Sequence, residues 1–155
     1  MSEEGGLSEG RALLWGTLIV GTADIVDAFI FFGLRGTRPV RILQGIASGL
    51  LGREAFGGGA ATAALGAVLH YFIAFVIVWV FLAASRRLPD LARRPWLYGP
   101  LYGLVVYAVM NYVVIPLSLV TVRSKPLAVL ANGLLIHMLG VGLTTALIAR
   151  ARRAT

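Results

Sequence analysis

Five polar side chains stand inside long apolar stretches of the sequence: Asp24, Asp27, His70, Asn111 and His137. Inside a membrane, acids and histidines bind cations, relay protons or pair with one another, because a charged group there costs about 2.5–3.5 kcal/mol. Asp24 and Asp27 lie one helical turn apart, which is more acid than helix packing needs. We therefore take the five residues as the candidate ion- or proton-binding site, and the apolar stretches as the elements that must position them.

The apolar stretches are long enough to predict four membrane-spanning helices. About 20 apolar residues cross a bilayer as a helix, at about 1.5 Å per residue. The stretch 57–84 contains no Asp, Glu, Lys or Arg and carries His70 at its centre. We expect the four spans to cover about 11–34, 57–84, 96–122 and 127–149.

The segment 39–52, PVRILQGIASGLLG, is too short to cross the bilayer. Its mixture of bulky and small residues is typical of an interfacial amphipathic helix, or of a shallow re-entrant segment packed on the bundle. We expect Pro100 and Pro116 to break the third span near its two ends. The sequence thus predicts an all-α, polytopic membrane protein: one transmembrane domain over residues 1–155, with four transmembrane helices and an interfacial or re-entrant segment after the first.

Composition excludes a soluble domain. The chain is 58% hydrophobic and only 14% charged, with a mean hydropathy of +0.84, whereas a soluble chain has roughly 25% charged residues. A net charge of +7 would suggest nucleic acid as the partner of a soluble protein. Here the basic residues cluster in short loops, where they fix topology and meet lipid headgroups, so we expect a lipid bilayer and no nucleic acid. With no Cys in the chain, thiolate metal sites and disulfides are excluded.

Four spans place the two chain ends and the loop 85–95 on one side of the membrane. That side carries eight Lys and Arg residues, and the other side carries six. Because basic loops favour the cytoplasm, we expect both termini to be cytoplasmic.

Four of the candidate residues lie at nearly the same depth. The span midpoints fall near residues 22, 71, 109 and 138, so Asp24, His70, Asn111 and His137 each lie within about two residues, or roughly 3 Å, of the centre. Small residues recur at helical spacing around each of them, and small residues mark the faces on which helices pack in lipid. We therefore expect the polar groups inside the bundle rather than against lipid.

This polar layer has a structural and a functional interpretation. In the structural one, the side chains only hydrogen-bond to one another and hold the helices in register, at about 0.6 kcal/mol per bond. In the functional one, they bind or translocate a proton or a cation, as in transporters and channels. We favour the transport-like interpretation, because two acids on one helical turn exceed what a structural role requires.

Two cofactor alternatives use the same residues. The two acids and the two histidines offer N and O ligands that suit a divalent metal such as Zn, Mn or Fe. His70 and His137, on different helices, could instead be the axial pair of a b-type haem. Asp24 and Asp27 would be awkward neighbours for a haem macrocycle, so we expect no cofactor.

The remaining alternative is a non-catalytic role as an accessory or assembly subunit of a larger membrane complex, or as a homo-oligomer. The small-residue pairs Gly45/Gly49 and Gly99/Gly103 could be docking stripes, although such pairs more often serve packing within one chain. An enzyme is not expected, because no loop carries a nucleophile–base pair, a P-loop or a zincin motif.

Four stretches of the chain resemble a set of small bacterial integral membrane proteins. They are QGIASGLLG (44–52), LGAVLHYFIA (65–74), SRRLP (85–89) and YGLVVYAVMNYVVIPLS (102–118). Those proteins are hypothetical ones with four predicted spans and no assigned activity. The resemblance covers most of the chain from Asp24 to Ser118 and implies a bacterial inner membrane, but it implies no mechanism and no functional residue.

Overall fold

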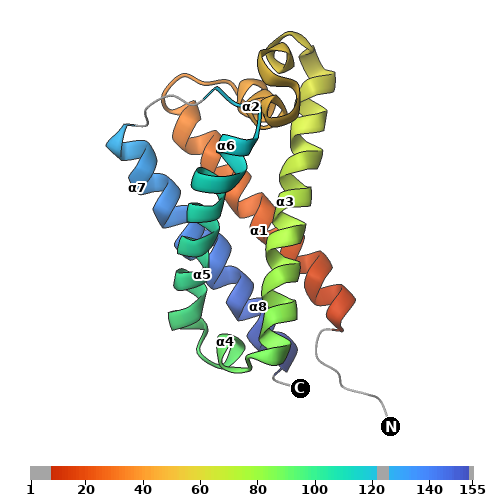
Figure 1. The fold of residues 1–155 in the computed structure, drawn as a ribbon, viewed down its shortest axis with the longest axis vertical. Coiled ribbons are helices and arrows are strands. Elements are labelled where there is room, and N and C mark those ends of the chain that lie inside the picture. Colours follow the sequence, from red (N-terminus) through yellow and green to blue (C-terminus); the bar gives the residue numbers. More distant parts are fainter. Residues whose placement is uncertain (1–7, 122–125, 154–155) are drawn as a thin grey trace.

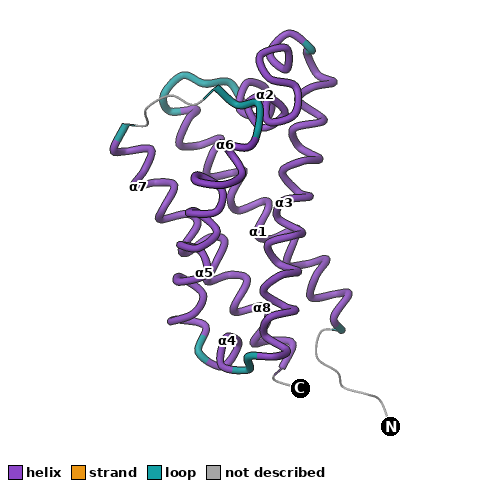
Figure 2. The backbone as a smooth tube through the Cα atoms, viewed as in Figure 1, coloured by secondary structure: helices purple, strands orange, loops and turns teal. Residues whose placement is uncertain are grey.

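The computed structural model describes residues 8–121 and 126–153, and every regular element in these ranges is helical (Figures 1 and 2). Four helical rods have the length and apolar composition to cross a membrane, which confirms the predicted fold class. The first two are α1 (Glu9–Gly33) and α3 (Gly59–Arg87). The third runs through α5 (Pro95–Val109), η2 (Met110–Val114) and α6 (Ile115–Leu117). The fourth runs through α7 (Leu127–Ile136), η3 (His137–Leu143) and α8 (Thr144–Arg153).

These bounds agree with the predicted spans to within a few residues, except at the end of the third span. Its helix stops at Leu117, five residues before the predicted end at residue 122, and residue 122 itself lies outside the described ranges, as does the rest of the loop 122–125. The rods pack side by side as one elongated bundle (Figure 1). This is the build of a multi-pass membrane protein in a lipid bilayer.

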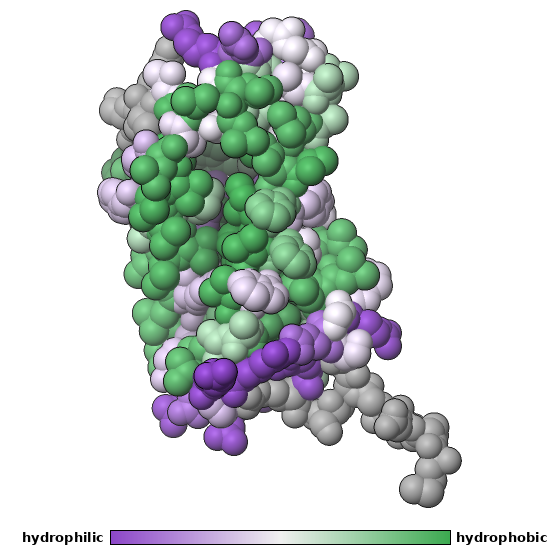
Figure 3. All heavy atoms as spheres, turned by 45° about the vertical axis from the view of Figure 1, so that its right-hand side comes forward, coloured by the Kyte–Doolittle hydropathy of each residue, from purple (hydrophilic) through white to green (hydrophobic). Residues whose placement is uncertain are grey.

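The two ends of the bundle differ in the elements that they hold. The α4 end holds the short helix α4 (Asp90–Arg93) together with the start of α1 and the end of α8. The α2 end holds α2 (Pro39–Leu51), the 3-10 helix η1 (Gly52–Gly57) and α6. Hydrophilic residues gather at both ends and apolar ones cover the face between them (Figure 3), as expected of a chain that crosses a bilayer once per rod.

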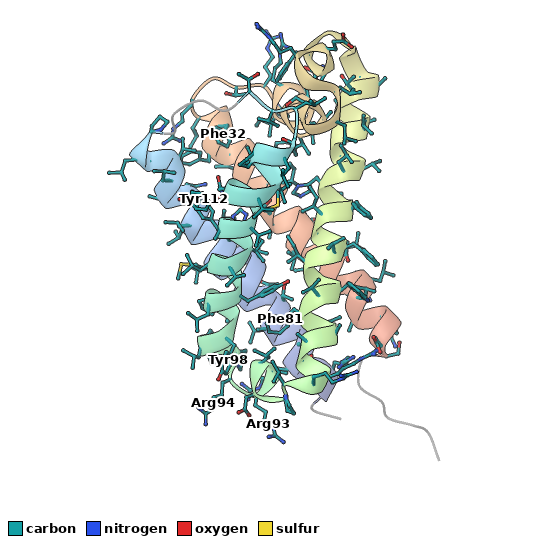
Figure 4. The ribbon with its side chains drawn as sticks, in the orientation of Figure 1. Phe32, Phe81, Arg93, Arg94, Tyr98 and Tyr112 are labelled. Carbon is teal, nitrogen blue, oxygen red and sulfur yellow. The ribbon has the colours of Figure 1, made fainter. Side chains whose placement is uncertain are left out.

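The half of the bundle next to the α4 end is closely packed. Phe81 of α3 is 1% exposed and packs on Tyr102 of α5, with 4.9 Å between the ring centroids (Figure 4). The Tyr102 hydroxyl donates a hydrogen bond of 2.7 Å to the Ile77 carbonyl, so the aromatic ring brings no unpaired polar group inside. Ala146 and Ala149 of α8 are fully buried in the same cluster. Small and aromatic side chains together fill this half.

The third and fourth rods cross at backbone contact. A Cβ atom added to Gly103 would overlap the His137 carbonyl, and one added to Gly142 would overlap the Gly99 carbonyl. Gly99 also faces the Leu143 backbone, whose Cα would lie 2.6 Å from an added Cβ. Only glycine permits this approach. The Gly99/Gly103 pair therefore packs within the chain and is not a docking stripe for a partner.

Helix α2 is fixed to the bundle rather than only resting on lipid. Gly66 of α3 meets the Leu43 backbone so closely that an added Cβ would overlap it. Gln44 is 3% exposed and donates to the Gly59 carbonyl at 3.0 Å, and the Leu119 amide donates to the Gly49 carbonyl at 3.0 Å. Of the two interpretations of segment 39–52, the packed one describes α2 better.

The two prolines differ in their effect on the third rod: the predicted break at Pro100 is wrong, whereas the helix does end just after Pro116. Pro100 lies inside the continuous helix α5. Pro116 lies in α6, which follows the π-helical η2 without a gap, and the Ile115 amide donates to the Met110 carbonyl five residues back. Because proline lacks an N–H, the helix loses one backbone bond at Pro116. The wider π turn accommodates the residues just before this defect, and the helix ends one residue after it, at Leu117.

Candidate functional site

A cavity of about 350 Å³ lies in the half of the bundle next to the α2 end. Its lining comes from all four rods and from α2, and it includes the five predicted polar residues, Asp24, Asp27, His70, Asn111 and His137. The structure thus brings all five to one internal space. Their role in ion or proton binding stays a prediction.

Asp24 and His70 form the centre of the site. The Nε2 atom of His70 lies 2.7 Å from the Gly21 carbonyl oxygen, a hydrogen bond that joins α3 to α1. The other ring nitrogen, Nδ1, lies 4.0 Å from the Asp24 carboxylate, which is beyond hydrogen-bond distance. Glycine at position 21 lets α3 come this close, because a Cβ there would lie 2.8 Å from the Tyr71 ring.

His137 and Asn111 line the opposite wall of the cavity, and both belong to π-helical segments. His137 begins η3, and its Nδ1 lies 2.8 Å from the Gly133 carbonyl one turn back. Asn111 in η2 donates to the Tyr107 carbonyl at 2.8 Å. The Tyr107 ring packs edge-on against His137, with 5.4 Å between the centroids. π-helical turns occur often at functional sites, so two of them in the lining of one cavity are consistent with a site here.

Asp27 does not join the other acid but binds a residue that the sequence argument left out. Its carboxylate accepts a hydrogen bond of 2.7 Å from the Asn132 amide, which ties α1 to α7 across the cavity. Asn132 was visible as an amide inside the fourth span. A search by depth missed it because it lies five residues before His137 and therefore outside the midplane layer. Tyr107, another lining residue, was missed because a tyrosine on a helix face usually packs.

The residues present do not fit a haem. The His70 nitrogen Nε2 is held by the Gly21 carbonyl, and Nδ1 faces the Asp24 carboxylate. Iron would have to bind Nδ1 beside a carboxylate 4.0 Å away, in a cavity of about 350 Å³. A metal ion fits no better, because no group of three or more His, Cys, Asp or Glu among residues 8–121 and 126–153 is close enough to hold one.

Comparison with known proteins gives no further guide to the site. No protein-family model matches the chain, and no curated protein or solved structure is significantly similar to it. The function is therefore inferred from the cavity and its side chains.

Proposed function

We propose that the protein binds a cation or a proton in this cavity, with Asp24 as the anionic group, and carries it across the membrane in a transport-like role. The observation that carries the proposal is the state of the Asp24 carboxylate. It accepts no hydrogen bond from any of the described residues, and its side chain keeps 28% of its surface accessible within the cavity lining. An acid at membrane depth needs a partner, and a bound cation or proton is the partner that the cavity can admit.

The other polar groups support this assignment because their hydrogen bonds are made within the protein. Asp27 is bound by Asn132, and the amide of Asn111 is bound to a helix carbonyl. A purely structural polar layer would pair Asp24 in the same way, because a paired charge is more stable in lipid than an unpaired one.

The membrane placement extends this proposal. Eight arginines, from Arg11 to Arg153, belong to the elements at the α4 end, which holds the start of α1 and the end of α8. At the α2 end the described residues contribute Arg35, Arg38, Arg41 and Arg53. By the positive-inside tendency, the α4 end faces the cytoplasm, in a bacterial inner membrane.

Electrical recording from proteoliposomes on a solid-supported membrane tests the proposal, because it detects charge moved by binding of any ion. The panel of rapid concentration jumps contains protons, sodium, potassium and one organic ammonium ion. We expect a protein-dependent current for at least one of them and its loss in Asp24→Asn. Asp90→Asn, which removes an exposed acid at the α4 end, is the matched control and should behave as wild type.

A silent wild-type protein across the whole panel, or a current that Asp24→Asn leaves intact, would refute the proposed function. The elution profile of each variant in size-exclusion chromatography shows whether it is folded, so that a misfolded variant is not scored as inactive.

A further inference from the structure

The hydrogen-bonding state of the two histidines defines what the cavity lacks. The Nε2 atom of His70 lies 2.7 Å from a carbonyl oxygen, and the Nδ1 atom of His137 lies 2.8 Å from another. A carbonyl oxygen only accepts hydrogen bonds, so each of these nitrogens carries the hydrogen. In a neutral imidazole the second nitrogen is then a bare acceptor. Nδ1 of His70 and Nε2 of His137 are therefore acceptors.

The third group in this set, the Asp24 carboxylate, is also an acceptor. With His70 neutral, its Nδ1 and the carboxylate are both acceptors and do not hydrogen-bond to each other, in agreement with the 4.0 Å between them. Asp27, Asn111 and Tyr107 also line the cavity, but the Asp27 oxygen and the Asn111 amide hydrogen are already used within the protein. What the cavity lacks is a donor with positive charge.

The walls decide what kind of cation can bring that donor. Sixteen of the 23 lining residues are Gly, Ala, Val, Ile, Met or Phe. A bare sodium, calcium or magnesium ion needs a shell of several oxygen ligands, which these walls do not provide. A volume of about 350 Å³ falls within the range of small-molecule pockets, about 300–1,000 Å³. Apolar walls around one carboxylate that accepts no hydrogen bond from the described residues suit an apolar body that carries one charge.

We propose that the cavity binds an organic ammonium ion, a primary amine in its protonated form with an apolar body. Its N–H groups donate to Asp24, His70 Nδ1 and His137 Nε2, and its body lies against the isoleucine-rich wall and the rings of Phe32 and Tyr107. This inference rests on the proposed cation-binding function and names its substrate class.

The test uses 2-phenylethylammonium and its N,N,N-trimethyl analogue as probes, with the full-length protein in proteoliposomes. The two ions have the same charge and nearly the same body, but the trimethyl analogue has no N–H to donate. We expect saturable binding of 2-phenylethylammonium, by radioligand filtration and by the binding current. The trimethyl analogue should bind at least about tenfold more weakly, because it cannot make the charge-assisted hydrogen bonds, which are the strong ones. Asp24→Asn should abolish binding of the ammonium ion, while Asp90→Asn should keep it.

If Asp24→Asn does not yield folded protein, Ala28→Leu takes its place, because Ala28 lines the cavity one turn from Asp24 and a leucine there extends into the space that the ammonium ion would occupy. Loss of 2-phenylethylammonium binding in this folded variant supports the proposal, and unchanged binding refutes it. Equal affinity for the two probes would show that the cavity recognises only the positive charge and not the N–H groups, and would overturn the ammonium assignment. Currents from protons or inorganic cations without any from the ammonium ion would overturn this inference and leave the proposed function standing. Silence toward every ion would refute both.

Discussion

The two halves of the bundle are built from the same four rods but differ in how they are filled. Next to the α4 end, Phe81 and Val78 are almost fully buried, and glycines bring the third and fourth rods into backbone contact. Next to the α2 end, the rods enclose a cavity of about 350 Å³. Val20 and Val141 belong to both regions and form the boundary between them. Helices in lipid associate through close packing, so the hollow half contributes less to the stability of the bundle. The difference teaches that the half next to the α4 end stabilises the protein and the half next to the α2 end leaves room for a ligand.

The largest expected effect comes from adding volume to each half. Ala146→Leu puts three more carbons into the closely packed half, where Ala146 is fully buried, and should destabilise by about 3 kcal/mol or more. Ala28→Leu extends into the cavity and should stay within about 1 kcal/mol of wild type, because the added carbons meet empty space. Unfolding in a titration with SDS, followed by fluorescence, measures both. Equal losses in the two variants would contradict the division into a solid and a hollow half.

The next effect tests the glycine crossing. Gly142→Ala places a methyl group against the Gly99 backbone and should cost about 2 kcal/mol. Gly45→Ala in α2 is the control, because nothing lies within 4 Å of its added Cβ; it should stabilise by about 0.5–1 kcal/mol through better helix propensity. The same SDS titration reports both changes, and a harmless Gly142→Ala would mean that the crossing is looser than described.

A smaller effect is expected from the bond that crosses the hollow half. Asn132→Ala removes the hydrogen bond to Asp27 and should cost about 0.6–1.7 kcal/mol, with faster hydrogen–deuterium exchange in α7. Asp27→Asn keeps an acceptor for the Asn132 amide while removing the charge, so α7 should exchange more slowly there than in Asn132→Ala. If α7 exchanges at the wild-type rate in Asn132→Ala, this bond does not hold the cavity closed.

The smallest effect belongs to the ion pairs at the α4 end. Glu9 pairs with Arg86 of α3 and lies 3.7 Å from Arg152 of α8. Glu9 is 46% exposed, so Glu9→Gln should cost less than about 1 kcal/mol. The difference in melting temperature from wild type should shrink in high salt because exposed charges are screened. A salt-independent loss would show that Glu9 contributes by packing instead.

The architecture was predictable from sequence because a membrane span is defined by length and apolarity alone, and no Asp, Glu, Lys or Arg interrupts 57–84. The gathering of Asp24, His70, Asn111 and His137 was predictable for a related reason: equal depth on neighbouring helices brings side chains together. Depth gives no information about which side chains then bond. For this reason Asn132 was missed, and the two acids, one turn apart in sequence, turned out to have different partners.

The cavity and the π-helical turns had no comparable signal. An empty volume depends on how far apart the rods lie, and that distance is set at the glycine crossing, remote in sequence from most of the lining. Pro116 marked a backbone defect, but sequence alone did not say that the chain would widen into a π turn before the helix ends there. Both features are products of tertiary packing.

The glycine crossing also gives the fourth rod a mechanical property. Gly103 packs directly against the His137 carbonyl, so the fourth rod is held at this point and can tilt about it. The part of the rod beyond this point is α7, ten residues from Leu127 to Ile136, or about 15 Å long. A tilt of about 10° at the Gly103–His137 contact moves the far end of α7 by roughly 2.6 Å. Asn132 lies five residues, or about 7.5 Å, from His137, so the same tilt moves it by roughly 1.3 Å. That shift lengthens the 2.7 Å bond between Asn132 and Asp27 to about 4 Å, which parts the two side chains and widens the cavity while the closely packed half stays still.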